Sequence, residues 1–214
     1  MGRTVRDPRL VGRAGRPFNY NEALKQLDMF FQGKDPVHKC MNRIVKRLEK
    51  AGIPYVIVGG MAVVAHHYER STNDVDLLVT PDGLVEFRKR FVPKNYDLVP
   101  GRSRQFVDKT NQVKVDILVT GGIPGRGHPT PIRFPDPNSV GQVIEDKRVV
   151  NLTTLIEMKL AARRPQDIAD VEKLIRFNDL DESFADRLHP SLRQDYIESL
   201  EDRRRDDEYL DSEI

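Results

Sequence analysis

The strongest constraint on the fold is a unit at residues 53–79, in which two apolar runs flank a pair of glycines. The first run, IPYVIV, is rich in β-branched residues and ends at Gly59-Gly60, as is typical of a strand that stops at a tight turn. The next segment, MAVVAHHY, is predicted to be a short helix, and DVDLLV a second strand. A strand, a helix and a strand in this order predict an α/β core.

The residues after this unit continue the same pattern. PDGLVEFRKRF begins with a proline and is predicted to be a helix. SRQFVD and QVKVDILVT are separated by the polar KTN, which predicts a hairpin. Residues 121–137 contain nine glycines or prolines and are expected to form a loop. Loops of this length in compact domains are usually functional or mobile.

Helices are expected on both sides of this core. In DPVHKCMNRIVKRLEKAG the apolar residues keep helical spacing, Asp35 is placed to cap the helix, and Gly52 to end it. NLTTLIEMKLAARR and QDIADVEKLIRF are predicted as two helices separated at Pro165, and a polar helix with the charged run EDRRRDDE follows. The predicted divisions are an arm at 1–16, N-terminal helices at 17–52, a core at 53–150 and a C-terminal helical region at 151–214.

The composition excludes several classes of protein. Only 38% of the 214 residues are apolar and 32% are charged, but the apolar ones come in blocks that can form a core. The net charge of +2 does not favour a protein that coats nucleic acid. Cys40 is alone, so neither a disulfide framework nor a cysteine-based zinc site is expected. With neither an apolar run of about 20 residues nor a secretory signal, we expect a cytoplasmic protein without a membrane partner.

The first sixteen residues contain five arginines and hardly any bulky apolar residue. Two interpretations stay open. The arm is a disordered tail, or it is a basic segment that contacts RNA or another polyanion.

Two aspartates at the start of the second predicted strand indicate a metal site. Side chains alternate along a strand, so Asp74 and Asp76 point the same way, roughly 7 Å apart. Carboxylates this close repel each other unless a cation lies between them, and magnesium prefers such oxygen ligands. Asp116 joins them if its strand lies alongside. Three acids without His or Cys match a two-ion phosphoryl-transfer site better than a zinc hydrolase. The alternative is an edge strand with a solvated face.

The glycine pair indicates a phosphate site beside these acids. A strand that ends in Gly59-Gly60 and turns directly into a helix brings backbone N–H groups and the positive end of the helix dipole toward a bound phosphate. Gly-Gly is common in turns, so the pair indicates a phosphate site only in combination with the acids.

Together these motifs resemble the nucleotidyltransferase superfamily that includes DNA polymerase beta-like enzymes. Its pattern is Gly-Gly after a strand, a helix, Asp-x-Asp on the next strand, and a third acid later, here Gly59-Gly60, Asp74-x-Asp76 and Asp116. The closer resemblance is to bacterial minimal nucleotidyltransferases, including those of abortive-infection toxin systems, over roughly residues 50–177. It implies an α/β (α+β) fold, with a small mixed sheet flanked by helices and helical additions at both ends.

The resemblance also implies an activity. A nucleoside monophosphate would pass from a nucleoside triphosphate to a hydroxyl acceptor, with release of pyrophosphate. Asp74 and Asp76 would bridge two Mg²⁺ ions, with Mn²⁺ as an alternative, and Asp116 would complete the second ion site and take the proton. Gly59, Gly60 and the start of the helix would hold the β- and γ-phosphates. The acceptor stays open among a tRNA end, a protein and a small molecule, and an antitoxin or a second copy of the chain stays open as a partner.

Four further residues are candidates for phosphate contacts. Lys159 and Arg163 fall inside the apolar arc of the helix predicted at 152–164, where a cation must reach water or find an anion. The resemblance offers the triphosphate as that anion, while Asp167 and Asp170 are interpreted as structural partners of these cations. Arg70 and Thr72 precede the acids, and the resemblance implies that they contact phosphates or steady the loop. Arg126 and His128, in the long loop, are candidates for facing the acceptor.

Two other functions remain open at this point. The same fold could serve as a non-catalytic module that binds nucleotides or proteins. The same acids could also serve a phosphatase or nuclease, which would hydrolyse its substrate without any acceptor.

Overall fold

The computed structural model describes residues 19–125, 127 and 129–212. The basic arm expected at 1–16 lies outside the described residues, as do Arg126 and His128. The predictions made for them therefore stay predictions.

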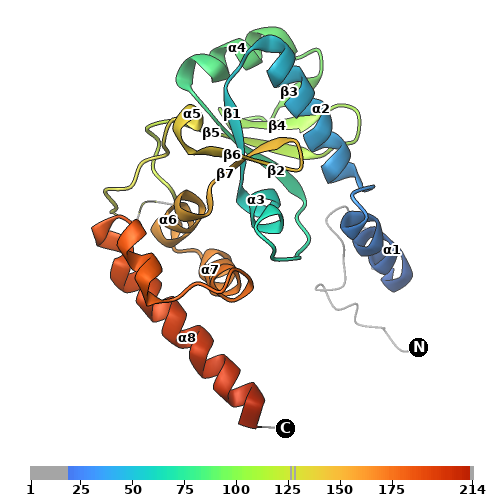
Figure 1. Cartoon of the computed structure of the whole chain (residues 1–214). Coiled ribbons are helices and arrows are strands. Elements are labelled where there is room, and N and C mark those ends of the chain that lie inside the picture. Colours follow the sequence, from blue (N-terminus) through green and yellow to red (C-terminus); the bar gives the residue numbers. More distant parts are fainter. Residues whose placement is uncertain (1–18, 126, 128, 213–214) are drawn as a thin grey trace, which may run out of the picture.

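The core is a seven-stranded mixed sheet with the strand order β3-β4-β5-β2-β1-β7-β6 (Figure 1). The central strand β2 pairs antiparallel with β1 and parallel with β5, and β1 pairs parallel with β7. Helices flank this sheet, so the predicted α/β fold with a mixed sheet is confirmed. The strands are β1 (Tyr55–Val58), β2 (Asp74–Val79), β3 (Tyr96–Leu98), β4 (Gln105–Asp108), β5 (Lys114–Val119), β6 (Gly141–Ile144) and β7 (Lys147–Val150).

Helices precede the first strand of the sheet and follow its last strand. Figure 1 shows α6 and α7 between the sheet and α8, while α2 runs beside the strands on another side. The helices are α1 (Tyr20–Phe31), α2 (Pro36–Ala51), α3 (Gly59–Ala65), α4 (Pro81–Phe91), α5 (Pro137–Val140), α6 (Leu152–Ala162), α7 (Pro165–Phe177) and α8 (Arg193–Ser212), with 3₁₀ turns at Glu182–Arg187 and Pro190–Leu192. None of the helices in the described part of the chain combines the length and the apolar character needed to cross a membrane.

The ends of α2 form as its sequence predicts. Asp35 accepts hydrogen bonds from the backbone N–H groups of Val37 at 2.6 Å and His38 at 3.3 Å, which satisfies donors that the first turn cannot pair internally. Pro36 occupies the first turn, where its missing N–H costs nothing. Gly52 ends the helix in the left-handed conformation at φ 66°.

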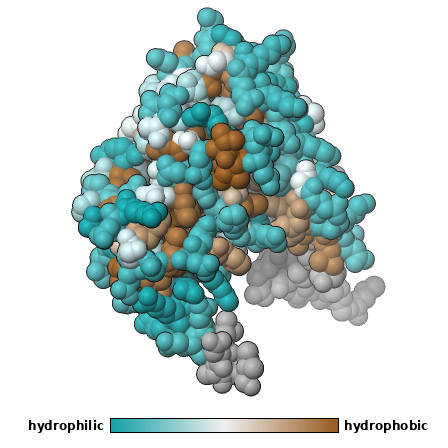
Figure 2. Space-filling view, viewed as in Figure 1, coloured by the Kyte–Doolittle hydropathy of each residue, from teal (hydrophilic) through white to brown (hydrophobic). Residues whose placement is uncertain are grey.

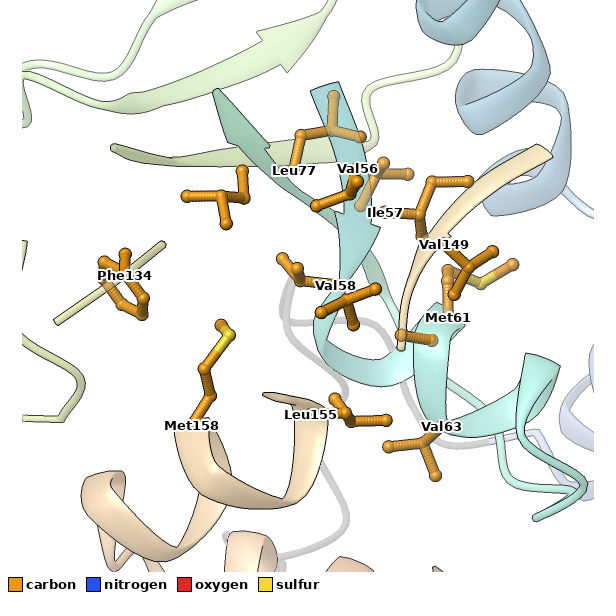
Figure 3. Close-up of a cluster of buried hydrophobic side chains, with 14 of the residues drawn as sticks. Val56, Ile57, Val58, Met61, Val63, Leu77, Phe134, Val149, Leu155 and Met158 are labelled. Carbon is orange, nitrogen blue, oxygen red and sulfur yellow. The ribbon is translucent and has the colours of Figure 1, made fainter. Parts of the chain in front are cut away.

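The core has two parts, one on either side of the central strands. All four residues of β1 are buried, and Figure 3 shows Val58 above Leu155 of α6, with Val63 of α3 beside Leu155. The second part is aromatic. The ring of Phe87 on α4 lies 5.2 Å from that of Tyr96 and 5.1 Å from that of Phe106, measured between centroids. Strand β2 is therefore covered on both faces, except at its first residues, where the acids lie.

Three strands were not predicted from the sequence. Strand β3 has only three residues, too few to show an alternating pattern. The β6–β7 hairpin turns at Glu145 and Asp146, which both have positive φ values, 46° and 62°. This is the geometry of a two-residue hairpin turn, but the residues are not the Asn-Gly or Asp-Gly that usually mark one.

Two helices differ from their predicted bounds. Helix α3 begins at Gly59 rather than at Met61 and ends at Ala65. Helix α6 ends at Ala162, because Arg163 adopts the left-handed conformation at φ 52°. The predicted continuation to residue 164 is therefore wrong.

The charged run at 201–208 lies in α8, as predicted. Its residues are exposed or half-buried, and Figure 2 shows the lower end of the molecule, where α8 runs, as largely hydrophilic. Tyr196 and Leu200 bury the opposite side of this helix. A solvated face on an anchored helix explains the charge run without a partner.

Truncation of the central strand should destabilise the protein strongly. Leu77 is fully buried and Leu98, on the short strand β3, is 45% exposed. Leu77→Ala is expected to lower the free energy of unfolding by about 2–5 kcal/mol because it leaves a cavity, whereas Leu98→Ala should cost less than about 1 kcal/mol. Urea denaturation of both variants measures the difference, and equal losses would contradict the burial described for β2.

Candidate active site

Three carboxylates meet where β2 and β5 lie side by side. The parallel register pairs Asp76 with Asp116 and Asp74 with Lys114. One oxygen from each of Asp74, Asp76 and Asp116 lies within 4.8 Å of the other two. The structure thus brings together the three acids predicted from the sequence. Asp116 was expected to join the other two only if its strand lay beside theirs, and β5 does pair with β2.

The electrostatics of this cluster are unfavourable without a cation. Burial, followed by the negative charges of Asp74 and Asp116, raises the pKa of Asp76 from its ordinary 3.8 to about 7, against the opposing effects of Arg164 and Lys114. The Nζ atom of Lys114 lies 2.8 Å from Oδ2 of Asp116. The other oxygen of Asp116, Oδ1, is buried and has no hydrogen-bond partner among the described residues. An unpaired, buried carboxylate oxygen is costly.

These residues fit a divalent cation. Carboxylate oxygens that converge from three side chains are the ligands that Mg²⁺ and Mn²⁺ prefer. A bound ion would relieve the repulsion on Asp76, and an ion or a bound substrate would give Oδ1 of Asp116 the partner it lacks. The expectation of a metal site at Asp74, Asp76 and Asp116 agrees with this geometry.

The glycine turn lies directly against the acids. Gly59 has φ 63°, and a Cβ atom at this position would come within 1.9 Å of Oδ2 of Asp76. A Cβ atom on Gly60 would come within 2.6 Å of Oγ1 of Thr72. Only glycine leaves space here for the side chains of the next strand. Among residues 19–125, 127 and 129–212, no side chain makes a capping hydrogen bond to the first turn of α3, whose N–H groups belong to this same turn.

Thr72 and Arg70 hold the segment that leads into β2. The hydroxyl of Thr72 donates to Oδ1 of Asp74 at 2.9 Å. The guanidinium of Arg70 pairs with Asp170 of α7, Nε lying 2.9 Å from Oδ1 and Nη2 lying 3.1 Å from Oδ2. Both residues line the cavity in front of the acids. Of the two roles predicted for them, these bonds support the steadying one.

Lys159 is buried, with 5% of the residue exposed, and is paired. Its Nζ atom lies 2.6 Å from Oδ2 of Asp170 and 3.4 Å from Oδ1 of Asp167. Asp167 and Asp170 are therefore partners of this cation, as interpreted from the sequence. Lys159 still lines the cavity, so its role toward a phosphate stays a prediction.

Arg163 is not brought together with the other candidates. Because α6 ends at Ala162, two residues earlier than predicted, the side chain of Arg163 leaves the helix face that carries Lys159. It pairs with Asp195 of α8 at 2.7 Å and is 52% exposed. It does not line the cavity that contains the acids.

Arg164, which sequence reasoning missed, lines this cavity instead. Its Nη2 and Nε atoms both donate to the carboxylate of Asp167, at 2.9 Å and 2.5 Å. These hydrogen bonds, and further the charges of Asp167 and Asp76, raise the pKa of Arg164. The signal that could have found it is Pro165, because a helix break before this proline changes the direction of the residues next to it.

Except for Arg163 and Asp170, these groups line one cavity of about 770 Å³. Gly59, Gly60, the three acids and the paired cations form part of its wall. Ile123, Phe134 and Met158 give it an apolar side. Residues 101–105, in the connection between β3 and β4 and the start of β4, complete the lining. This last segment was not singled out from the sequence.

Comparisons with known proteins find similarity at the level of structure. No family model matches the sequence, and no curated protein matches it. A candidate nucleotidyltransferase from H. pylori matches with 18% identity and a TM-score of 0.41, over 70% of this chain and 72% of that one. A nucleotidyltransferase-like protein from Paracoccidioides brasiliensis matches with 18% identity and a TM-score of 0.44, over 76% and 86%. ANT(2″)-Ia, in complex with adenylyl-2″-tobramycin, matches with 13% identity and a TM-score of 0.49, over 75% and 96%.

Two of these descriptions name the superfamily that the sequence motifs resemble. At these identities the likeness concerns the fold alone. The function is therefore inferred from the geometry of the site.

Gly59→Ala is expected to damage both the fold and the acidic cluster. Its Cβ would collide with Asp76 in addition to the strain of a positive φ. Gly52→Ala is the matched control, because φ is 66° there and no atom lies within 4 Å of the added Cβ. We expect a loss of about 1 kcal/mol for the control and at least about 1–3 kcal/mol more for Gly59→Ala, measured by urea unfolding. Equal losses would contradict the described contact with Asp76.

Asp76→Asn is expected to stabilise the metal-free protein at high pH. Since the folded pKa is raised to about 7, the stability linked to Asp76 is fully present below about pH 4 and is lost as the pH rises through 7. At pH 8 the variant should gain on the order of 4 kcal/mol over the unsubstituted protein, and at pH 4 almost nothing. Thermal melts at both pH values measure this.

Two controls accompany this measurement. Asp82→Asn, on the exposed first turn of α4, should show no such pH dependence. Added Mg²⁺ should stabilise the unsubstituted protein, more at pH 8 than at pH 5, and should lose most of that effect in Asp76→Asn. A gain of the same size at pH 4 and pH 8 would contradict the repulsion described here.

Proposed function

We propose that this protein transfers a nucleoside monophosphate from a nucleoside triphosphate to a hydroxyl acceptor and releases pyrophosphate. The observation that carries the proposal is the position of three carboxylates, within 4.8 Å of one another, beside the Gly59-Gly60 turn. The cavity in front of them, about 770 Å³, is within the usual range for sites that hold a ligand of this size.

Asp74, Asp76 and Asp116 would hold two divalent ions, Mg²⁺ or Mn²⁺. Bound there, such ions neutralise phosphate charge and lower the pKa of an acceptor hydroxyl. The protein supplies ligand oxygens that its own packing holds in place, with Thr72 fixing one of them through its bond to Asp74. Ligands fixed in this way need little reorganisation during the reaction.

Asp116 is the group proposed to receive the acceptor's proton. Its Oδ1 atom is free of hydrogen bonds among the described residues, while Oδ2 is engaged by Lys114. The acceptor oxygen forms a bond to the α-phosphorus, the bond from that phosphorus to the bridging oxygen breaks, and pyrophosphate leaves with the electron pair. The hydroxyl proton passes to the carboxylate as the new bond forms.

The triphosphate is proposed to lie against the paired cations that line the cavity. Lys159, Arg70 and Arg164 bring three positive charges, and Asp167 and Asp170 bring two negative ones. One positive charge therefore remains uncompensated in this network beside the cavity, in which Lys159 is buried and Arg164 is exposed. The uncapped first turn of α3 adds backbone donors on the same side of the acids.

The test is transfer of label from each nucleoside triphosphate carrying ³²P at the α-position. The purified protein is incubated with Mg²⁺, each triphosphate and a cell lysate, and labelled products are separated into nucleic acid, protein and small molecules. Asp76→Asn should reduce labelling and pyrophosphate release at least about 100-fold, and Asp82→Asn should leave both unchanged.

Other outcomes distinguish the alternative functions. Binding of triphosphates by calorimetry, without pyrophosphate release in any acceptor fraction, would support a non-catalytic nucleotide-binding module. Release of nucleoside monophosphate without an acceptor would support a hydrolase that uses the same acids. Either result would overturn the proposed transfer.

A further inference from the structure

The acceptor side of the cavity contains a short basic loop that the proposed chemistry does not use. Residues 99–104, VPGRSR, join β3 to β4. The backbone N–H of Arg102 donates to the carbonyl of Val99 at 3.0 Å, and that of Ile117 donates to the carbonyl of Arg104 at 2.8 Å. Arg88 of α4 donates to the carbonyl of Ser103. Bonds to β5 and α4 therefore hold this loop in place.

Two arginines in this loop differ from the other cations that line the cavity. Arg70, Lys159, Arg164 and Lys114 each pair with a carboxylate. The side chains of Arg102 and Arg104 are exposed, and within the described part of the chain neither makes an ion pair or a hydrogen bond. Both residues line the cavity. Their charges are therefore available to a ligand without breaking an existing interaction.

The order of the strands separates this loop from the glycine turn. Gly59 follows β1, Asp76 lies on β2, Asp116 on β5, and Gln105 begins β4. In the ladder Asp76 pairs with Val58 on one side and with Asp116 on the other, and Asp116 pairs with Gln105. These four paired residues form a row across the sheet from Val58 to Gln105. Adjacent strands are about 4.8 Å apart, so this row is roughly 14 Å long. The glycines and the arginines lie at its opposite ends, with Asp116 between them.

This order assigns the two substrates to different ends of the row. The inference rests on the proposed function, in which the triphosphate occupies the glycine end and Asp116 receives the acceptor's proton. The acceptor hydroxyl then lies near Asp116, and the part of the acceptor next to that hydroxyl faces the loop of Arg102 and Arg104.

The charges that line the cavity favour an anionic acceptor. The carboxylates that line the cavity are the three of the acidic cluster and that of Asp167. Asp167 is already bound by Arg164 and Lys159, so no unpaired carboxylate outside the acidic cluster remains among the lining residues to bind an amino group. Two unpaired guanidinium groups, in contrast, match phosphate in charge and geometry.

A polynucleotide end has the required arrangement of groups. Its terminal hydroxyl is followed at once by a phosphodiester, and further phosphates continue along the chain. Five arginines and a single acid in residues 1–16 add a second concentration of positive charge in the sequence, which suits a polymer of phosphates better than one small phosphorylated molecule.

We propose that the acceptor is the hydroxyl end of a single-stranded nucleic acid, and that Arg102 and Arg104 bind its terminal phosphates. These arginines position the acceptor and take no part in the chemistry.

The test is direct binding of a short fluorescent oligonucleotide to the full chain, measured by anisotropy at several salt concentrations. Arg102→Ala/Arg104→Ala should weaken binding at least tenfold at low salt. It should also reduce the slope of log affinity against log salt by about 1.4, since each phosphate contact to a single strand contributes about 0.7. The matched control is Arg204→Ala/Arg205→Ala, which removes the same charge from the exposed face of α8 and should leave both quantities nearly unchanged.

A second ligand and a second variant separate this proposal from the proposed function. Affinity for a nucleoside triphosphate should be unchanged in Arg102→Ala/Arg104→Ala, which also shows that the variant is folded. Asp76→Asn should keep its oligonucleotide affinity even though transfer is lost. If Asp76→Asn retains transfer, the proposed function fails, whatever the oligonucleotide result.

Three outcomes would overturn the assignment of the arginines. The unsubstituted protein does not bind the oligonucleotide, or both double variants weaken binding equally, or the loop variant loses triphosphate affinity instead. Parallel ribo- and deoxyribo-oligonucleotides show whether the bound chain is RNA or DNA, because only RNA offers the 2′-hydroxyl.

Discussion

The structure depends on one electrostatic constraint, the crowding of three carboxylates at the parallel pair β2–β5. The register that pairs Asp76 with Asp116 also buries Val75, Leu77 and Leu78 completely, so the packing of the strand holds the acids together against their repulsion. A shift by one residue would turn every side chain of β2 to the opposite face. The apolar residues of the strand thus fix the position of the acids, and a cation is what makes their proximity favourable.

The same constraint explains the second layer of charge around the cavity. Asp170 is fully buried and accepts hydrogen bonds from Lys159 of α6 and from Arg70 of the segment before β2. Breaking a buried pair of this kind leaves an uncompensated charge, which is strongly destabilising. The helices after the sheet are therefore tied to the acidic strand through ion pairs as well as through the apolar contacts that Leu155 makes. The C-terminal helices form part of the site and not only an addition to it.

The sequence predicted this architecture where a pattern was long or chemically distinctive. Strand β2 and helix α2 have clear periodicity, and Asp35 and Gly52 have defined roles at the helix ends. The acids could be predicted because side chains alternate along a strand, although only the structure shows that β5 adjoins β2. The prediction for Arg163 extended a helical period past the point where the helix stops. The β6–β7 hairpin lacks the usual turn residues, and its position follows from tertiary pairing. The loop of Arg102 does contain a turn signal, Pro100-Gly101, but no pattern in the sequence places this turn beside the acids.

The cations around the cavity divide into two sets, and this division has a physical consequence. Lys159 is buried and paired, and Arg164, although exposed, is held by two hydrogen bonds to Asp167, so both hold fixed positions before any ligand arrives. Arg102 and Arg104 are exposed and unpaired within the described residues, so their contacts to an anion are screened by salt and tolerate different positions of it. A fixed end suits a donor whose phosphates must be held in one geometry, and an adaptable end suits an acceptor that enters and leaves as part of a longer chain. The acidic cluster lies between them, where the two substrates have to meet.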